Sequence, residues 1–244
     1  MSSRQPGRSV GRTVRLVVGP AGLAAAGLVL SGCGASTGIH PGAAAVIGDE
    51  TISMSKIDTT TTRYCEAYEP QITQQSQRVP MRYLRQFVAA NLSQRALGRQ
   101  LAAAYDVQPT SQYDQQVTKV EQQFASASSQ LRDAVVDVEA GGAYLSTVQV
   151  AIGQKLLAES GTTNPTAKEA LQRGQVATAD WLKDNAVSID PVLGIAADGG
   201  QFKAASDQTS YPLSPLASQG AAAAGASQPD PDYTAALGAS QVCG

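Results

Sequence analysis

Hydrophobic residues recur at helical spacing through most of the chain between residues 54 and 185. Apolar side chains at i, i+3, i+4 and i+7 form one face of a helix, so this pattern predicts a mainly helical protein. We expect Pro70 to end the first helix, and Gly141–Gly142 to separate the third helix from the fourth. The predicted helices span Met54 to Tyr68, Pro80 to Tyr105, Thr110 to Val138 with a weak stretch at Ser126–Ser129, Leu145 to Leu157, and Asn164 to Asn185.

A short hairpin is predicted before the first helix. Val46–Ile47 and Thr51–Ile52 have the composition of strands, and Gly48–Glu50 between them is typical of a tight turn. Ser53 follows the second strand, and serine is a favoured N-cap because its hydroxyl accepts a hydrogen bond from a free backbone N–H. The chain is therefore expected to pass from hairpin to helix at this residue.

The segment after the last predicted helix begins with one more strand pattern, Val187–Pro191. Beyond Gly194 the periodicity is lost, and residues 221–227 consist almost wholly of alanine and glycine. Such segments bury too little apolar area to offset the entropy of ordering. We therefore divide the chain into a helical domain at residues 43–194 and an irregular or disordered tail at residues 195–244.

The first 33 residues have the pattern of an export signal. A positive start without acidic residues precedes an apolar stretch from Leu16 to Leu30, which is shorter than the roughly 20 residues of a membrane-spanning helix. Leu30-Ser31-Gly32-Cys33 resembles the bacterial lipobox, in which the cysteine thiol is acylated after cleavage before it. Residues 1–32 would then be a lipoprotein signal peptide and residues 33–42 a polar tether. The alternative is an ordinary signal peptide with a chance cysteine. The positive start consists of Arg4, Arg8, Arg12 and Arg15.

Removal of the signal changes the charge of the protein. The chain has 18 basic and 20 acidic residues, and the four arginines leave with the signal, so 14 − 20 gives a net charge of −6. No clustered basic patch of the kind that binds phosphates is evident, so nucleic acid is not an expected partner. Aromatic residues make up 5% of the chain, which favours small-residue helix packing over a β-sandwich.

Two cysteines remain besides Cys33. Cys65 lies in the first predicted helix and Cys243 at the extreme C-terminus. An exported protein keeps disulfides, so one bridge between these residues is possible in this compartment. The alternative is two unpaired thiols, one buried and one in the tail.

The sequence offers few residues for catalysis or metal binding. The one histidine, His40, lies in the tether, where it cannot be held as a base beside a serine or cysteine nucleophile. Asp133, Asp137 and Glu139 lie close together on a predicted helix, a pattern more typical of a solvated face than of a metal site. Trp181 is expected to anchor packing. We therefore predict no catalytic residue, no metal and no cofactor, and the protein is not expected to be an enzyme.

The order of these pieces resembles a known family. Residues 46–58, VIGDETISMSKID, resemble the opening of the SurA-type chaperone domain, and Val187–Pro191 after a long helix resembles its closing strand. The resemblance covers roughly residues 43–194. It implies a multi-helix domain whose N-terminal hairpin is joined by the C-terminal returning strand. The alternative is an unrelated helical domain with a chance hairpin. A parvulin module would require its own histidines and strands, so prolyl isomerase activity is not expected.

The resemblance implies a chaperone or folding factor, and the lipobox pattern at Cys33 implies that lipid anchors it on the extracytoplasmic face of the cell membrane. Its partners would be unfolded or exported proteins, held in an apolar groove between helices. The alternative is a non-catalytic interaction module that docks one dedicated envelope partner. Candidate groove residues, each of which could equally serve in the core, are Tyr64, Tyr68, Tyr83, Phe87 and Phe124.

Overall fold

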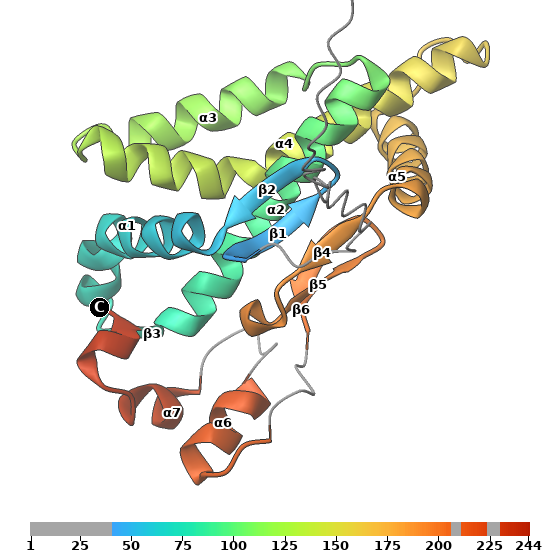
Figure 1. The fold of residues 1–244 in the computed structure, drawn as a ribbon. Coiled ribbons are helices and arrows are strands. Elements are labelled where there is room, and N and C mark those ends of the chain that lie inside the picture. The colour runs from blue at the N-terminus through green and yellow to red at the C-terminus, as the bar shows by residue number, and fades with distance from the viewer. Residues whose placement is uncertain (1–40, 206–210, 224–229) are drawn as a thin grey trace, which may run out of the picture. The chain divides into compact units, whose positions relative to one another are not determined.

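Five long helices form the body of the described protein (Figure 1). The computed structural model describes residues 41–205, 211–223 and 230–244, which all belong to the unit Gly38–Gly244. Helix α4 packs against α2, α3 and α5, and α1 packs against both α2 and α4. The mainly helical fold class predicted from periodicity is confirmed. The helices are α1 (Met54–Gln74), α2 (Met81–Tyr105), α3 (Ser111–Gln123), α4 (Ser129–Glu159) and α5 (Ala167–Asp184).

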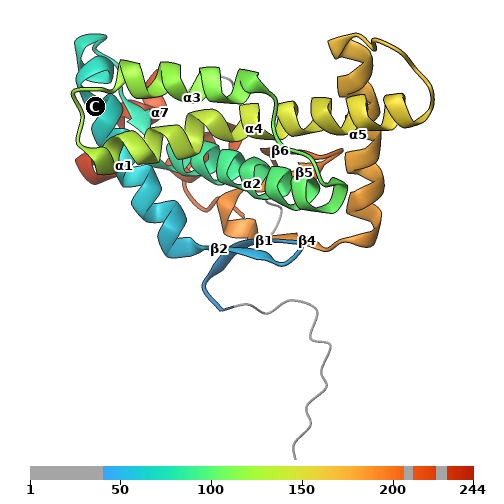
Figure 2. The same ribbon diagram turned by 90° about the horizontal axis from the view of Figure 1, so that it is seen from above.

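A three-stranded antiparallel sheet joins the two ends of the helical region. Strands β1 (Ala43–Ile47) and β2 (Glu50–Ser53) form the hairpin, and β4 (Val187–Ile189) pairs with the other edge of β1. Figure 2 shows the three strands side by side, in the order β2-β1-β4. The predicted hairpin and the returning strand are both confirmed. The last strand therefore closes the helical region onto its beginning.

The turn of the hairpin depends on glycine. Gly48 has a φ of +61°, which suits the first central position of a tight two-residue hairpin turn. Its N–H donates to the carbonyl of Ala186, just before β4. Ser53 caps α1 as predicted, because its hydroxyl accepts from the N–H of Lys56 at 3.1 Å. The hairpin, its turn and the helix start are thus fixed by local residue chemistry.

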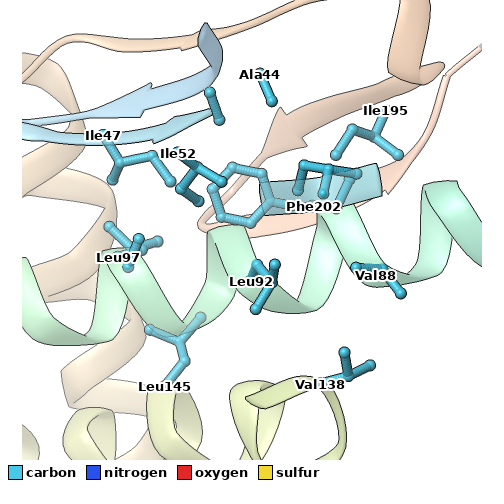
Figure 3. Packing of buried hydrophobic residues seen from close by; sticks show 14 of the residues in the cluster. Ala44, Ile47, Ile52, Val88, Leu92, Leu97, Val138, Leu145, Ile195 and Phe202 are labelled. Carbon is cyan, nitrogen blue, oxygen red and sulfur yellow. The ribbon is translucent and has the colours of Figure 1, made fainter. Parts of the chain in front are cut away.

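The core lies between this sheet and the helices. Figure 3 shows Ile47 and Ile52 of the sheet above Leu92 and Leu97 of α2. Val138 and Leu145 of α4 lie on the opposite side of α2, so α2 is covered from both sides. Each large apolar side chain buried in this way contributes about 1.5–3 kcal/mol. Burial against α2 is the main force that holds the sheet on the helices.

Helix α4 runs without interruption through Gly141–Gly142, so the predicted break at these residues is wrong. The two glycines instead let α4 approach α2 closely. A Cβ atom on Gly141 would overlap with the backbone carbonyl of Asn91, whereas one on Gly142 would meet the flexible end of Gln94 at 2.7 Å. The predicted weak point at Ser126–Ser129 is where α3 and α4 are separated.

The first helix continues past Pro70, contrary to the prediction that proline ends it there. An internal proline removes one helical hydrogen bond and costs about 3 kcal/mol. Tyr68 and Ile72, on either side of Pro70, pack against the core. Burial of these side chains offsets the missing bond, and the helix ends at Gln74 instead.

The residues after Gly194 contain more regular structure than the predicted irregular tail. Strands β5 (Ile195–Asp198) and β6 (Gln201–Ala204) form a second hairpin. Its buried residues, Ile195 and Phe202, complete the core beside α2 (Figure 3). Two apolar residues are enough to fix this hairpin on a preformed core, although they are too few to produce a readable period in the sequence.

Short elements complete the described chain. A 3-10 turn, η1 (Pro191–Leu193), links β4 to β5, and η2 (Ala239–Gln241) precedes the last strand. That strand, β7 (Val242–Cys243), pairs with β3 (Val79–Pro80) between α1 and α2. The extreme C-terminus is therefore part of the folded unit. The remaining helices are α6 (Pro215–Ala223) and α7 (Pro231–Ala235).

We expect Gly141→Ala to lower the free energy of unfolding by about 2 kcal/mol, because the new methyl group forces two helix backbones apart. Gly142→Ala is the matched control. Its methyl group displaces only a side-chain end, and alanine favours the helix by up to about 1 kcal/mol. Chemical denaturation measures both values, and equal changes in the two variants would contradict the close approach at Gly141.

Candidate functional site

Four of the five aromatic residues proposed as a client groove form one continuous row. Tyr64 and Tyr68 lie one turn apart on α1, with ring centroids separated by 4.7 Å. The ring of Phe87 on α2 lies 5.8 Å from Tyr64, and that of Phe124 at the end of α3 lies 5.0 Å from Tyr68. Aromatic pairs at these separations attract each other beyond the area they bury. We call these four residues the aromatic row.

One carboxylate of α4 holds the two tyrosines in place. The hydroxyl groups of Tyr64 and Tyr68 both donate to Oε1 of Glu139, the second over 3.2 Å. Burial, followed by the hydrogen bond and the negative charge of Glu139, raises the pKa of Tyr64. Burial, followed by the charge of Glu139, raises the pKa of Tyr68 to about 12. Both hydroxyl groups therefore stay protonated, and can donate to Glu139, well above physiological pH.

Exposure varies along the aromatic row. Tyr64 and Phe124 are buried and Tyr68 is half-buried, while Phe87 keeps 43% of its surface exposed. The row is thus largely part of the core, and its Phe87 end reaches solvent. Phe87 is thus the member of the row with a large exposed surface, and the buried ring of Tyr64 packs against it.

Tyr83 does not belong to the aromatic row. It lies one turn before Phe87 on α2, is half-buried, and has Tyr233 and Asp230 of the C-terminal segment near its hydroxyl. Burial is the main cause that raises its pKa. The structure therefore assigns Tyr83 to the contact between α2 and α7.

The structure joins Cys65 to Cys243 by a disulfide with an S–S distance of 2.08 Å. Cys65 lies on α1, so the bridge fixes the C-terminal strand β7 to this helix. The two residues are 178 positions apart. In the chain-entropy model, closure of so long a loop stabilises the fold by about 5 kcal/mol. Cys33 and His40 lie outside the described residues.

Asp137 and Glu139, two of the three acidic residues for which a solvated face was predicted, have partners, so that prediction fails for them. Asp137 accepts from Lys56 over 2.8 Å and also from Arg95, while Glu139 accepts from the two tyrosines. Asp133 is exposed. The partners come from α1 and α2, far away in sequence, and a pattern along α4 alone cannot reveal them.

A charged groove of about 340 Å³ lies along strand β2. Lys56 of α1 and Arg95 and Arg99 of α2 line it, together with Glu50 and Asp137. Arg99 donates to Glu50, and this hydrogen bond is the main cause that raises the pKa of Arg99. Sequence reasoning did not identify this groove. The sequence did contain a signal for a cationic surface in this region, because residues 71–105 contain five arginines and no acidic residue.

Two other pockets are found among the described residues. One pocket, of about 410 Å³, lies between the α1–α2 connection and α7, and the charged side chain that lines it is Arg78. The other, of about 360 Å³, lies on β1 and β4 beside Pro41, where the described chain begins. Trp181 on α5 packs against the core, in line with the anchoring role expected for it.

Comparison with protein-family models, with curated proteins and with solved structures found no match. Within the described ranges, no helix has the length and apolar composition needed to cross a bilayer. In the same residues, no group of three or more His, Cys, Asp or Glu side chains is placed to hold a metal ion.

We expect Tyr64 and Tyr68 to ionise last among the eight tyrosines in an absorbance titration at alkaline pH. Because their pKa values in the folded state exceed the ordinary value of 10.0, their contribution to stability is complete below pH 10. The contribution of Tyr68 is lost as the pH rises through about 12, and that of Tyr64 is lost only at higher pH. Glu139→Gln should lower both pKa values towards 10 without reaching it, since burial remains. Asp133→Asn is the control, and an equal shift in both variants would contradict the role of Glu139.

Proposed function

We propose that the protein is a membrane-anchored chaperone or folding factor for exported proteins, without prolyl isomerase activity. One observation carries the proposal: the hairpin β1–β2 and the strand β4, from opposite ends of the helical region, form one sheet. This arrangement is the one that the SurA-type resemblance implies. The chain's one histidine, His40, precedes strand β1 in the sequence, and isomerase activity is not part of the proposal.

The surface around Phe87 supports binding of unfolded chains. Phe87 is a large apolar side chain with 43% of its surface exposed, and the ring of Tyr64 packs against it. Hydrophobic burial has no directional requirement, so such a surface accepts many different apolar side chains. Weak contacts of this kind need neither a cofactor nor a nucleophile.

The proposed anchor is lipid on Cys33. Two or more acyl chains give stable attachment to a bilayer, whereas one chain alone is marginal. The ten residues 33–42 extend at most about 35 Å, because each residue spans up to about 3.5 Å. The anchor would therefore keep Gly42, at the start of the described chain, within about 35 Å of the lipid-bearing residue.

A second candidate function, docking of one dedicated envelope partner, is favoured by the segment Tyr211–Leu216. Tyr211 and Leu213 are 86% and 97% exposed, and Pro212 and Pro215 restrict the backbone around them. A rigid exposed apolar segment suits recognition by one specific groove. Crosslinking followed by co-purification separates the two functions, since many clients support a chaperone and one stoichiometric protein supports docking.

Palmitate labelling in cells tests the anchor. We expect radiolabelled palmitate to enter the wild-type protein, and we expect Cys33→Ala to abolish the label, because the thiol is its attachment point. Ser36→Ala, three residues after Cys33, is the matched control and should keep the label. Unchanged labelling of Cys33→Ala would reject the lipid anchor.

Suppression of aggregation tests the chaperone proposal. We expect the mature protein at equimolar ratio to slow the aggregation of a denatured exported client. Phe87→Ala should reduce this effect several-fold, because truncation of an exposed contact residue costs on the order of 1 kcal/mol of binding. Light scattering measures the rate, and thermal denaturation checks that the variant folds.

Tyr211→Ala is the matched control for an exposed aromatic residue outside the aromatic row. It should leave the suppression of aggregation unchanged. Equal losses in Phe87→Ala and Tyr211→Ala would show that general surface hydrophobicity acts instead of the aromatic row. If the wild-type protein failed to slow aggregation, the chaperone proposal would be abandoned.

A further inference from the structure

Strand β2 presents a free edge in the described sheet, where the order is β2-β1-β4. The N–H of Gly48 donates to Ala186 and the carbonyl of Ala44 accepts from Asp190, so even-numbered residues of β1 face β4. Backbone groups alternate along an antiparallel strand, so Val46 also faces β4. Thr51 lies opposite Val46 and must therefore point its own N–H and C=O away from β1.

The free edge lies beside the charged groove of about 340 Å³ described above. This volume falls within the range of about 300–1,000 Å³ that is usual for ligand sites. All four residues of β2 line the groove, and Leu92 of α2 gives it an apolar part. Figure 3 shows Leu92 on α2, below Ile52 of β2. An extended chain placed here would thus have a backbone partner on one side and a helix surface on the other.

The charges of the groove are unequal. Three cations, Lys56, Arg95 and Arg99, face two carboxylates, Glu50 and Asp137. Asp137 is shared between Lys56 and Arg95, and Glu50 binds Arg99. A guanidinium group has five N–H donors, so one carboxylate does not saturate it. The groove therefore has capacity for one more carboxylate.

Strand β2 also differs from edge strands that are protected against pairing. Proteins commonly block free edges with lysine, proline or unpaired charges. Strand β2 contains neither lysine nor proline, its Glu50 is paired with Arg99, and Thr51 is exposed and uncharged. The edge is thus open to backbone pairing at Thr51.

We propose that an extended segment of a client protein adds to the free edge of β2 and places an acidic side chain against Arg95 and Arg99. Backbone hydrogen bonds to Thr51 supply affinity for any extended chain, as in other cases of strand addition. The arginines supply the preference for an aspartate or glutamate, through charge-assisted hydrogen bonds. This inference rests on the proposed function and names a second contact for the same clients, apart from the Phe87 surface.

Fluorescence anisotropy with short labelled peptides tests the inference on the full mature protein. The probe is an eight-residue peptide of alternating threonine and valine with one central glutamate, blocked at both ends so that its only carboxylate is the side chain. We expect it to bind at least about tenfold more tightly than the glutamine analogue, since hydrogen bonds to charged groups are the stronger kind.

Two further analogues test strand addition itself, each N-methylated on one set of alternate amides. One set blocks the peptide edge that would face β2, and the other leaves that edge intact. We expect one analogue to lose about tenfold in affinity and the other to bind like the parent peptide. Equal binding of both analogues and the parent would overturn strand addition, and this result needs no protein variant.

Protein variants locate the site. Arg95→Gln combined with Arg99→Gln should remove the preference for glutamate over glutamine, whereas Arg173→Gln on the exposed face of α5 should not. Thr51→Pro should weaken every peptide, because it removes the outward N–H at a position where an edge strand tolerates proline. An unaltered preference in the double variant would overturn the assignment of the arginines.

The results also separate this inference from the proposed function. If the protein slows client aggregation but binds none of the peptides, the β2 site is wrong and the chaperone proposal stands. If it neither slows aggregation nor binds the peptides, both are wrong. If it binds the peptides as expected, the β2 site is supported whatever the effect of Phe87→Ala.

Discussion

The described fold depends on the close approach of helix α4 to the backbones of two other helices. A Cβ atom on Gly141 would overlap with the carbonyl of Asn91 on α2, and one on Gly153 would overlap with that of Ala170 on α5. Gly174 of α5 meets the carbonyl of Gln149 on α4 in the same way. Interiors are packed as densely as organic crystals, so no larger residue fits without moving a helix. The position of α5 then determines where β4 can meet β1.

Both candidate binding surfaces follow from this placement of α4. Asp137 and Glu139 are two residues apart and therefore point about 200° apart around the helix. Asp137 reaches Lys56 and Arg95 beside β2, while Glu139 reaches Tyr64 and Tyr68 of the aromatic row. One helix thus supplies the carboxylates of two separate surfaces. A shift of α4 along α2 would disturb both surfaces together.

Local residue chemistry made parts of this fold predictable from the sequence. Ser53 caps α1, and Thr166 and Glu169 form the capping box at the start of α5, since each signal acts within four residues. The predicted start of this helix at Asn164 is three residues too early, because α5 begins at Ala167 behind the capping box. The hairpin was equally readable from its strands and Gly48.

Long-range contacts were not readable in the same way. Two consecutive glycines are typical of a helix end, so the sequence of Gly141–Gly142 predicted a break. Only the position of α2 shows that the absence of a side chain at Gly141 allows the two helices to pack closely. Pro70 lies inside α1, and Ile72 beyond it packs, partly buried, against the core. Four of five proposed aromatic residues were found together, yet periodicity could not show that Phe87 is the most exposed of them.

The ion pairs beside β2 help to explain why that surface can bind a ligand. Lys56, Arg95 and Arg99 are between about one quarter and one half exposed, and ion pairs in such positions contribute about 0–1 kcal/mol to stability. The fold therefore does not rely on them, because burial against α2 supplies far more. A carboxylate from another chain can share Arg95 or Arg99 without loss of a contact that the core requires. Charges that stabilise a fold so little, yet gather along an open strand edge, are better suited to recognition than to folding.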